Sequence, residues 1–199
     1  YSNFFSKEYE NQVYIKPENL QITGAFKIRG AYNKIYMLSK EKKAKGLVAA
    51  SAGNHAQGVA FSANKLGVKA TIVMPAYTPL IKVEATKSYG VEVILHGECY
   101  DDAYVKAIEL EKEYGYTFIH PFDDEEVIAG QGTIGLEIIN ELDDVDYIIV
   151  PIGGGGLISG IGEYIKSIKP SIKIIGVEPR GAQTLKKSID KGKISKLSK

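Results

Sequence analysis

Two glycine-bearing loops are the segments of this sequence best suited to bind a ligand. The stretch Pro151-Ile152-Gly153-Gly154-Gly155-Gly156-Leu157 follows an apolar run and precedes a predicted helix. Four consecutive glycines let backbone N–H groups converge, and a helix N-terminus adds partial positive charge. The loop lacks a convincing G-x-G-x-x-G fingerprint and does not end in Gly-Lys-Ser/Thr, so it is not a nucleoside-triphosphate loop. It predicts a site for a single phosphate held by backbone groups, with a flexible glycine turn as the alternative.

The second loop, Ser51-Ala52-Gly53-Asn54-His55-Ala56-Gln57-Gly58, also lies between a predicted strand and a predicted helix. Asn54 and His55 begin that helix, so their backbone N–H groups could bind a carboxylate. The side chain of Asn54 adds an amide donor, whereas Ser51 could simply cap the helix. Both loops follow strands, and open α/β sheets bind ligands at the carboxyl ends of their strands.

Two further segments are weak signals when taken singly. Lys27 opens a predicted helix within Gln21-Ile22-Thr23-Gly24-Ala25-Phe26-Lys27-Ile28-Arg29-Gly30-Ala31, and alone it would be interpreted as a surface lysine. The stretch Ile128-Ala129-Gly130-Gln131-Gly132-Thr133 is a glycine-spaced entry to a helix after Pro121-Phe122.

The elements that must position these segments alternate between short apolar runs and helical stretches. Runs that are apolar along most of their length are typical of strands buried on both faces of a parallel sheet. The predicted strands are Val13–Lys16, Gly46–Ala50, Ala70–Met74, Val91–Leu95, Thr117–His120, Tyr147–Pro151 and Lys173–Val177. The predicted helices are Phe26–Ser39, Asn54–Leu66, Pro79–Tyr89, Tyr100–Tyr114, Glu125–Leu142, Gly155–Ile168 and Gln183–Asp190. This alternation predicts an α/β fold with right-handed crossovers.

Composition excludes several classes of protein. The 199 residues carry 25 Lys+Arg against 24 Asp+Glu, and 44% are hydrophobic, which argues against disorder and against a global basic field for nucleic acid. The lysine-rich stretch 186–199 is interpreted as a solvated helix end or loop. A single cysteine, Cys99, favours a reducing, cytoplasmic setting. No apolar run approaches the roughly 18–20 residues of a membrane span, so no membrane partner is expected.

The four segments together resemble the motifs of the serine/threonine dehydratases, in the tryptophan synthase β-like family of pyridoxal-phosphate enzymes. The stretch from Lys16-Pro17-Glu18-Asn19-Leu20-Gln21 into Thr23–Ala31 is similar to that family's cofactor-lysine motif. Ser51–Gly58 resembles its asparagine loop, Gly153–Leu157 its phosphate loop, and Gly130–Thr133 a substrate-side loop. The motifs agree in order and spacing along essentially the whole chain, which makes the resemblance specific.

The resemblance assigns roles to the matching positions. Lys27 would form a Schiff base with pyridoxal phosphate and act as the general base, Phe26 would pack against the cofactor ring, and Asn54 would bind the ring oxygen. Backbone groups of Gly153, Gly154, Gly155, Gly156 and Leu157 would hold the phosphate. The substrate would be bound by Ser51, Ala52, Gly53, Asn54 and His55, together with Gly130 and Gln131 of the substrate-side loop.

Two positions depart from the pattern of the related racemases. Ala52 stands where those relatives place a proton-donating Ser, so the resemblance favours dehydration over racemisation. Glu178 resembles a cation ligand of the racemases, but the next ligand would fall at Thr184, where they carry an acid. We therefore expect no metal. Glu178 has two interpretations, a cation ligand or a carboxylate in a local hydrogen-bond network.

The implied architecture is two three-layer α/β/α domains with mostly parallel sheets, known as fold type II. Residues 49–120 would form a small domain, and residues 1–48 with 121–199 an incomplete large domain. Because the resemblance ends soon after Glu178, we expect an unpaired sheet edge and exposed apolar surface.

The implied activity is deamination of L-threonine or L-serine to a 2-oxo acid and ammonia, within amino-acid metabolism such as isoleucine biosynthesis. The partners would be a small amino-acid substrate and further copies of the chain in a homo-oligomer. The alternatives are a serine racemase, another β-elimination or replacement enzyme of the same fold, and a non-catalytic cofactor-binding fragment.

Overall fold

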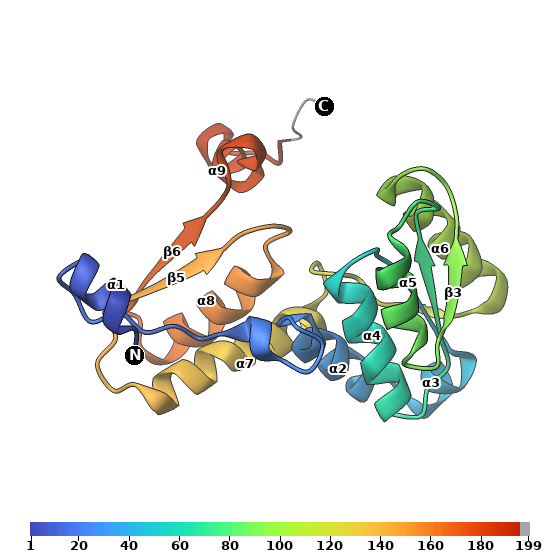
Figure 1. Ribbon diagram of the computed structural model, residues 1–199, viewed down its shortest axis with the longest axis horizontal. Coiled ribbons are helices and arrows are strands. Elements are labelled where there is room, and N and C mark those ends of the chain that lie inside the picture. Colours follow the sequence, from blue (N-terminus) through green and yellow to red (C-terminus); the bar gives the residue numbers. More distant parts are fainter. Residues whose placement is uncertain (196–199) are drawn as a thin grey trace.

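The computed structural model describes residues 1–195, which form two parallel sheets with helices packed against them (Figure 1). Residues 196–199, the end of the lysine-rich stretch, lie outside the described part. The strands are β1 (Leu47–Ala50), β2 (Ala70–Met74), β3 (Glu92–Leu95), β4 (Thr117–Phe118), β5 (Tyr147–Pro151) and β6 (Lys173–Val177). The α-helices are α1 (Asn3–Glu8), α2 (Lys27–Met37), α3 (Lys40–Lys45), α4 (Asn54–Lys65), α5 (Leu80–Lys87), α6 (Tyr100–Tyr114), α7 (Glu125–Glu141), α8 (Gly156–Ile168) and α9 (Thr184–Lys191). Short 3-10 turns cover Glu18–Leu20 and Arg180–Ala182.

The first sheet has the strand order β3-β2-β1-β4, and every neighbouring pair is parallel. All residues of β1 and β2 are buried, as their continuous apolar runs predict. The predicted α/β class with parallel sheets is therefore confirmed.

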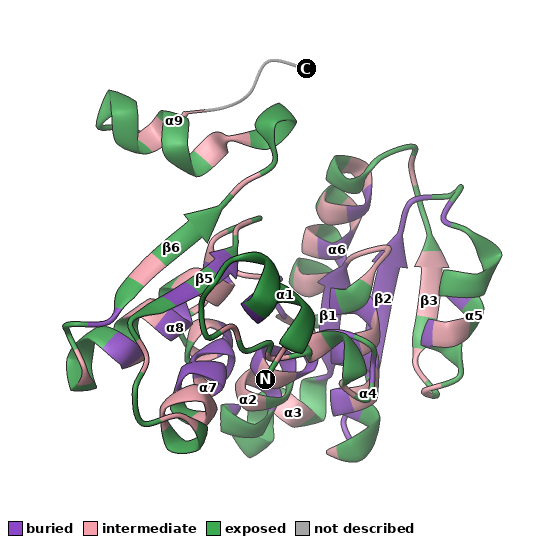
Figure 2. Ribbon diagram, turned by 60° about the vertical axis from the view of Figure 1, so that its left-hand side comes forward, coloured by how far each residue is buried: buried purple, intermediate pink, exposed green. Residues whose placement is uncertain are grey.

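Helices cover both faces of this first sheet, which gives it three layers. On one face, α2, α4 and α5 pack against alternate strand residues such as Leu47 and Ile72. On the other face, Ala103 and Ala107 of α6 pack against Val48 and Val73. The buried strands stand out between their helices in Figure 2.

The core of the first sheet also takes in residues that precede position 49. Ala31 and Ile35 of α2 belong to it, as does Leu38 at the end of that helix. The predicted boundary between residues 48 and 49 falls inside β1. The division of the chain at residues 49 and 120 stays a prediction.

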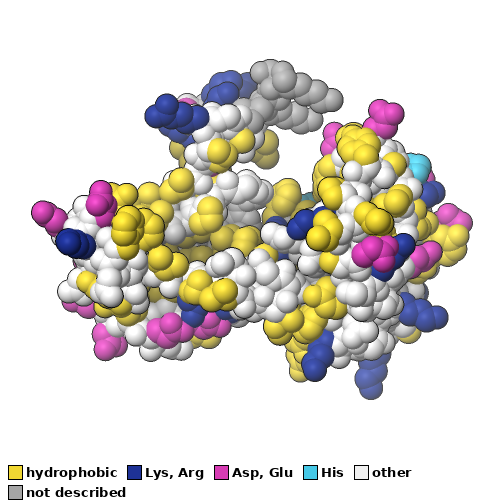
Figure 3. Space-filling view, viewed as in Figure 1, with side chains coloured by type: hydrophobic (Ala, Val, Ile, Leu, Met, Phe, Trp, Pro, Cys, Tyr) yellow, Lys and Arg dark blue, Asp and Glu magenta, His cyan; other side chains and the backbone are white. Residues whose placement is uncertain are grey.

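The second sheet consists of β5 and β6, paired in parallel. Ile148 and Val150 face α7 and α8, where Ile161 and Ile165 complete a second core. On the opposite side Tyr147 and Ile149 are 54% and 67% exposed. Within the described residues, helices thus cover one face of this sheet. The other face exposes apolar side chains, which is the exposed apolar surface expected from the sequence (Figure 3).

The helices α4, α2, α7 and α8 pack against one another in that order and connect the two sheets (Figure 1). Glycines permit the close crossings. A Cβ built at Gly130 would lie 2.6 Å from the backbone oxygen of Arg29 on α2, and one at Gly132 would lie 2.8 Å from that of Gly160 on α8. The crossings therefore bring backbone against backbone, without intervening side chains.

One predicted strand is absent from the structure, and two short helices were not predicted. Val13–Lys16 is not a strand, because Val13 N donates to Ser6 Oγ (2.9 Å) and its carbonyl accepts from Ser2 N (2.8 Å). Helices α1 and α3 were not predicted. Each has six residues and begins at a serine cap, Ser2 or Ser39, so it is too short to show an amphipathic period.

Three helices are followed by a glycine in the left-handed conformation. Gly67, Gly90 and Gly115 follow α4, α5 and α6 with φ angles of 66°, 77° and 69°. No helix of the described residues is long and apolar enough to cross a membrane.

Candidate functional site

Lys27 is the first residue of α2, and its amine points toward the turn that follows β4. Its Nζ donates a hydrogen bond of 2.5 Å to the backbone oxygen of Pro121 and lies 5.4 Å from the centre of the Phe26 ring. A Cβ built at Gly58 would lie 3.1 Å from the carbonyl carbon of Lys27, so α4 packs directly on the lysine backbone. Burial lowers the pKa of Lys27, which raises the fraction of neutral, nucleophilic amine at a given pH.

The loop before α4 leaves the start of that helix without a side-chain cap. Its N-cap residue is Gly53, and Ser51 Oγ instead accepts from Gly53 N at 3.2 Å. The alternative interpretation, that Ser51 caps the helix, is therefore wrong, because Ser51 lies two residues before the N-cap position. Asn54 is exposed at the first position of α4. The uncapped N–H groups at this helix start are suited to bind an anion.

The ring of His55 is buried, with 3% of the residue exposed. Its Nε2 lies 2.8 Å from the backbone oxygen of Ile119. Since a carbonyl only accepts, Nε2 carries the hydrogen and Nδ1 is left as an acceptor. Burial, with smaller contributions from Lys27 and His120, lowers the pKa of His55 to about 3, so the ring is neutral. The sequence assigned only the backbone of His55 to the site, and the ring contact was missed.

The four glycines before α8 meet different physical requirements. A Cβ at Gly154 would overlap the ring of Phe122, and one at Gly156 would lie 2.6 Å from the Phe122 backbone oxygen. Gly155 has a φ of +92° and is the uncapped N-cap residue of α8. A Cβ at Gly153 would meet no heavy atom within 4 Å. Gly154 and Gly156 thus permit packing, Gly155 permits the turn, and Gly153 faces open space.

One short turn, which we call the 119–123 turn, contacts all three segments. Ile119 contacts His55, Pro121 contacts Lys27, and Phe122 contacts the glycine loop. The structure therefore brings these three predicted segments together around residues that the sequence marked only as a flank.

Gly130 and Gln131 lie elsewhere, in the crossing of α2 and α7. Gln131 is 1% exposed, and its Oε1 accepts from Gly30 N at 3.2 Å. Gly130 packs against the backbone of Arg29 and Gly30. Both residues lie within α7, inside the predicted helix Glu125–Leu142, and their assignment to the substrate side stays a prediction.

Glu178 anchors the start of α9. Its carboxylate accepts from Leu185 N and Lys186 N, both at 2.9 Å, and from Thr184 Oγ1 at 3.4 Å. These hydrogen bonds, led by the one from Lys186 N, lower the pKa of Glu178. Among the described residues no group of three or more His, Cys, Asp or Glu side chains could hold a metal ion. The contacts fit the local network that the sequence left open.

A family model described as "Pyridoxal-phosphate dependent enzyme" matches residues 1–199. L-threonine ammonia-lyase of Thermotoga maritima is 51% identical over 197 residues, which cover 99% of this chain and 49% of that protein. L-threonine dehydratase catabolic TdcB of Escherichia coli (strain K12) is 51% identical over 98% of this chain and 59% of its own length.

Solved structures agree with these matches. Processed threonine deaminase isoform 2 of Solanum lycopersicum superimposes with a TM-score of 0.96 at 47% identity, covering 98% of this chain and 54% of that one. Maize serine racemase superimposes with a TM-score of 0.95 at 41% identity, covering 98% and 60%.

The chain spans about half the length of the curated relatives it matches. The family model nonetheless covers every residue from 1 to 199. The glycine loop, the uncapped helix starts and the half-buried lysine therefore lie in a chain that belongs to the family of pyridoxal-phosphate dependent enzymes.

Proposed function

We propose that the full-length protein is a lyase that deaminates L-threonine or L-serine to 2-oxobutyrate or pyruvate and ammonia. The names of the relatives, L-threonine ammonia-lyase and L-threonine dehydratase, support this activity. The observation that carries the proposal is the position of the Lys27 amine. It is half-buried against the Pro121 carbonyl, on the turn that also contacts the asparagine loop and the glycine loop.

The residues present fit pyridoxal phosphate. Lys27 offers an amine that condenses with an aldehyde, and the loop before α8 offers backbone N–H groups with no Cβ on Gly153. Two buried polar atoms, Thr23 Oγ1 and His55 Nδ1, have no hydrogen-bond partner within the described residues, and both belong to the motifs around Lys27. When bound, the cofactor supplies an electron sink for charge at the substrate Cα.

The proposed contacts follow the resemblance. Lys27 and Phe26 hold the cofactor ring, and Asn54 binds the ring oxygen. Gly153, Gly154, Gly155, Gly156 and Leu157 hold the phosphate. The start of α4, from Ser51 through Ala52 and Gly53 to Asn54 and His55, holds the substrate carboxylate.

Lys27 is the proposed general base. An ordinary lysine is protonated at neutral pH, because its pKa is near 10.4. Burial of Lys27 lowers its pKa and so favours the neutral amine that can accept the substrate α-proton. A fixed carboxylate fixes which Cα bond reacts, which favours elimination over other reactions.

The second candidate activity is serine racemisation, because maize serine racemase matches the fold closely. Ala52 argues against it, since a methyl group has no proton to give to the opposite face of Cα. A role in amino-acid metabolism is supported by the name of one relative, L-threonine dehydratase biosynthetic IlvA. That the enzyme is a cytoplasmic homo-oligomer stays a prediction.

The test is product formation by the full-length protein loaded with pyridoxal phosphate. We expect 2-oxobutyrate from L-threonine and pyruvate from L-serine, each with an equal amount of ammonia. Visible absorbance of bound cofactor without formation of a 2-oxo acid would favour the alternative of a non-catalytic, cofactor-binding protein. A β-replacement product formed with an added thiol, in place of the 2-oxo acid, would favour a replacement enzyme.

A further inference from the structure

We propose that His120 is a positioning residue, which holds the 119–123 turn and through it the Lys27 amine, the His55 ring and the glycine loop. This inference rests on the proposed function, since it concerns the same site. His120 itself contacts none of the groups proposed to hold cofactor or substrate by a hydrogen bond within the described residues.

The His120 imidazole holds the turn from inside. Its Nδ1 accepts hydrogen bonds from two backbone groups, Asp123 N at 2.7 Å and Phe122 N at 3.3 Å. The ring lies edge-on to that of Phe122, with centroids 4.7 Å apart, and to that of Phe118, at 6.0 Å. Within the described residues, no other group accepts from these two N–H groups.

The turn presents three contacts within four consecutive residues. The Ile119 carbonyl lies 2.8 Å from His55 Nε2, the Pro121 carbonyl accepts from Lys27 Nζ, and Phe122 packs on the glycine loop. Two of these contacts are made by backbone carbonyls, whose directions depend on the backbone angles of the turn alone. A change in those angles therefore displaces the partners of Lys27 and His55 together.

Both ends of the turn are fixed independently of His120. Before it, Ile119 N donates to the Val48 carbonyl at 2.9 Å, which continues the pairing of β4 with β1. After it, Asp124 caps α7 by accepting from Val127 N at 3.1 Å and pairs with Lys34 Nζ at 2.7 Å. Loss of the His120 acceptor should therefore relax the turn locally and leave the flanking strand and helix in place.

The acceptor role requires a neutral ring with its hydrogen on Nε2. Burial lowers the pKa of His120, and nearby Lys27 on α2 lowers it further, whereas Asp123 and Asp124 on the same loop raise it. His55 on α4 also faces it. Protonation of Nδ1 would remove both hydrogen bonds at once.

Replacing His120 with asparagine or with leucine distinguishes loss of the hydrogen-bond acceptor from a change in side-chain volume. The Oδ1 of asparagine occupies the place in the side chain that Nδ1 has in histidine, and it accepts from the same two N–H groups in the common Asx turn. Leucine fills a similar volume but accepts nothing. His96, an exposed histidine just after β3, provides a matched control for loss of an imidazole.

The experiment uses the full-length protein without cofactor and without substrate. The first readout is the pKa of Lys27, followed by NMR of the reductively ¹³C-methylated amine. The second is the affinity for sulfate, a tetrahedral dianion whose charge is constant in weak acid, measured by calorimetry. We expect His120→Leu to raise the Lys27 pKa toward its ordinary value and to weaken sulfate binding about fivefold or more.

His120→Asn and His96→Leu should keep both wild-type values. The sulfate affinity of the wild type should decrease in acid as His120 becomes protonated. His120→Asn should not show this decrease. If His120→Leu lowers the melting temperature but leaves the Lys27 pKa and sulfate affinity unchanged, the proposal is wrong. If His120→Leu does not fold, the comparison of His120→Asn with wild type decides. An equal decrease in sulfate affinity in acid in both proteins would overturn the proposal.

Because neither readout involves an amino acid, they stay informative if the full-length protein does not deaminate threonine. That result would remove the proposed function and leave the positioning role to be judged by the Lys27 pKa and the sulfate affinity.

Discussion

The amine of Lys27 donates a 2.5 Å hydrogen bond to the backbone oxygen of Pro121, which lies 94 positions further along the chain. A carbonyl partner carries no net charge, so it holds the amine without raising its pKa as a carboxylate would. The lysine thus stays in place and retains the lowered pKa that burial gives it.

Replacing Lys27 tests its proposed bond to the cofactor. In the full-length protein, Lys27→Ala should abolish the visible absorbance of lysine-bound pyridoxal phosphate and the deamination of L-threonine. The exposed Lys40 of α3 is the control, and Lys40→Ala should retain the absorbance. If the band survives in Lys27→Ala, then the cofactor is bound by another amine.

Two glycines of α8 predict opposite effects of the same substitution. A Cβ at Gly160 would overlap the Ile128 backbone oxygen and lie 2.7 Å from Gly132 N, whereas one at Gly162 meets nothing within 4 Å. Gly160→Ala should therefore destabilise the protein by about 1–3 kcal/mol through overpacking. Gly162→Ala should stabilise it by up to about 1 kcal/mol, because alanine is the better helix former. Thermal denaturation measures both, and equal melting temperatures would contradict the described crossing of α7 and α8.

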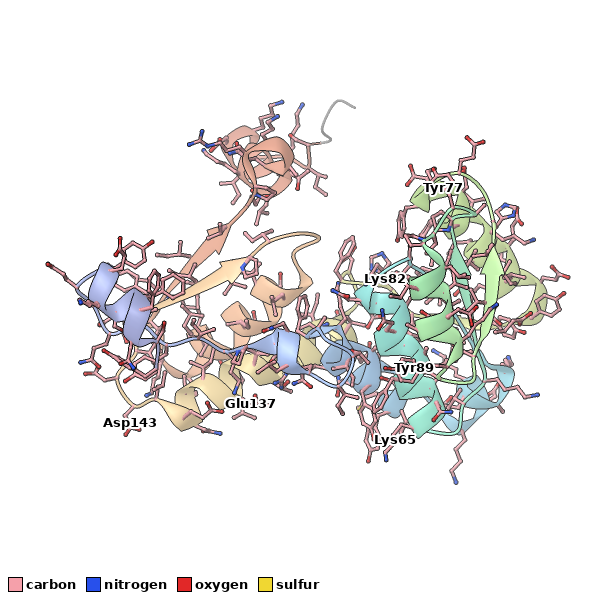
Figure 4. The ribbon with its side chains drawn as sticks, in the orientation of Figure 1. Lys65, Tyr77, Lys82, Tyr89, Glu137 and Asp143 are labelled. Atoms are coloured by element: carbon pink, nitrogen blue, oxygen red, sulfur yellow. The ribbon has the colours of Figure 1, made fainter. Side chains whose placement is uncertain are left out.

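Arg29 on α2 joins two carboxylates that come from distant segments. It pairs with Glu18 at 2.8 Å and with Glu137 of α7, labelled in Figure 4, at 2.6 Å, and 12% of its side chain is exposed. Arg29→Met should cost about 1–3 kcal/mol of unfolding free energy, because it leaves both carboxylates without their guanidinium. In the exposed pair of Lys106 and Glu109, Lys106→Met should cost about 0.5 kcal/mol or less.

The pH dependence of the Arg29 effect has a definite sign. Its hydrogen bonds lower the pKa of Glu137 to about 2, below the unfolded value of about 4.3. The stability gained from this pair is therefore complete above the unfolded pKa and is lost as the pH falls toward 2. Urea denaturation at a series of pH values should show a smaller acid loss in Arg29→Met than in wild type, and parallel curves would exclude this account.

His55 should be neutral and carry its hydrogen on Nε2 across the neutral and mildly acidic range. Because its pKa is lowered to about 3, the unfolded state binds more protons below the ordinary value near 6.5. The free energy of unfolding therefore falls as the pH drops from about 6.5 toward 3. Nitrogen NMR of the imidazole reports the tautomer directly, and an ordinary titration near 6.5 would disprove the burial argument.

Replacing His55 tests its neutral state through the free energy of unfolding. His55→Gln should lower the free energy of unfolding at neutral pH and reduce its decline in acid. His96→Gln, at an exposed histidine, should leave that decline as in wild type.

Ala52 predicts the stereochemical outcome with L-serine. If the position opposite Lys27 has no proton donor, the full-length protein should form pyruvate with negligible D-serine. Chiral chromatography of the reaction mixture measures both products. A D-serine yield comparable to the pyruvate yield would show that another residue protonates the second face of Cα.

Much of the fold could be read from local patterns. The buried runs Leu47–Ala50 and Ala70–Met74 were identifiable as central parallel strands, because strands covered on both faces are apolar at every position. The glycines after helices were identifiable because only they adopt positive φ readily. The short helices at 3–8 and 40–45 were not identifiable, because their stability comes from caps and tertiary contacts and not from periodicity.

The candidate site divides in the same way. The sequence by itself determined the glycine loop, the asparagine loop and the lysine, since each follows a strand or opens a helix in a recognisable local pattern. It did not indicate the buried hydrogen bond from Gly30 N to Gln131 Oε1, which spans 101 positions. Only the tertiary structure decided that one turn after β4 would contact all three segments. The reason is physical: that turn acts largely through backbone carbonyls, which every residue possesses and which therefore leave no signature in the side chains.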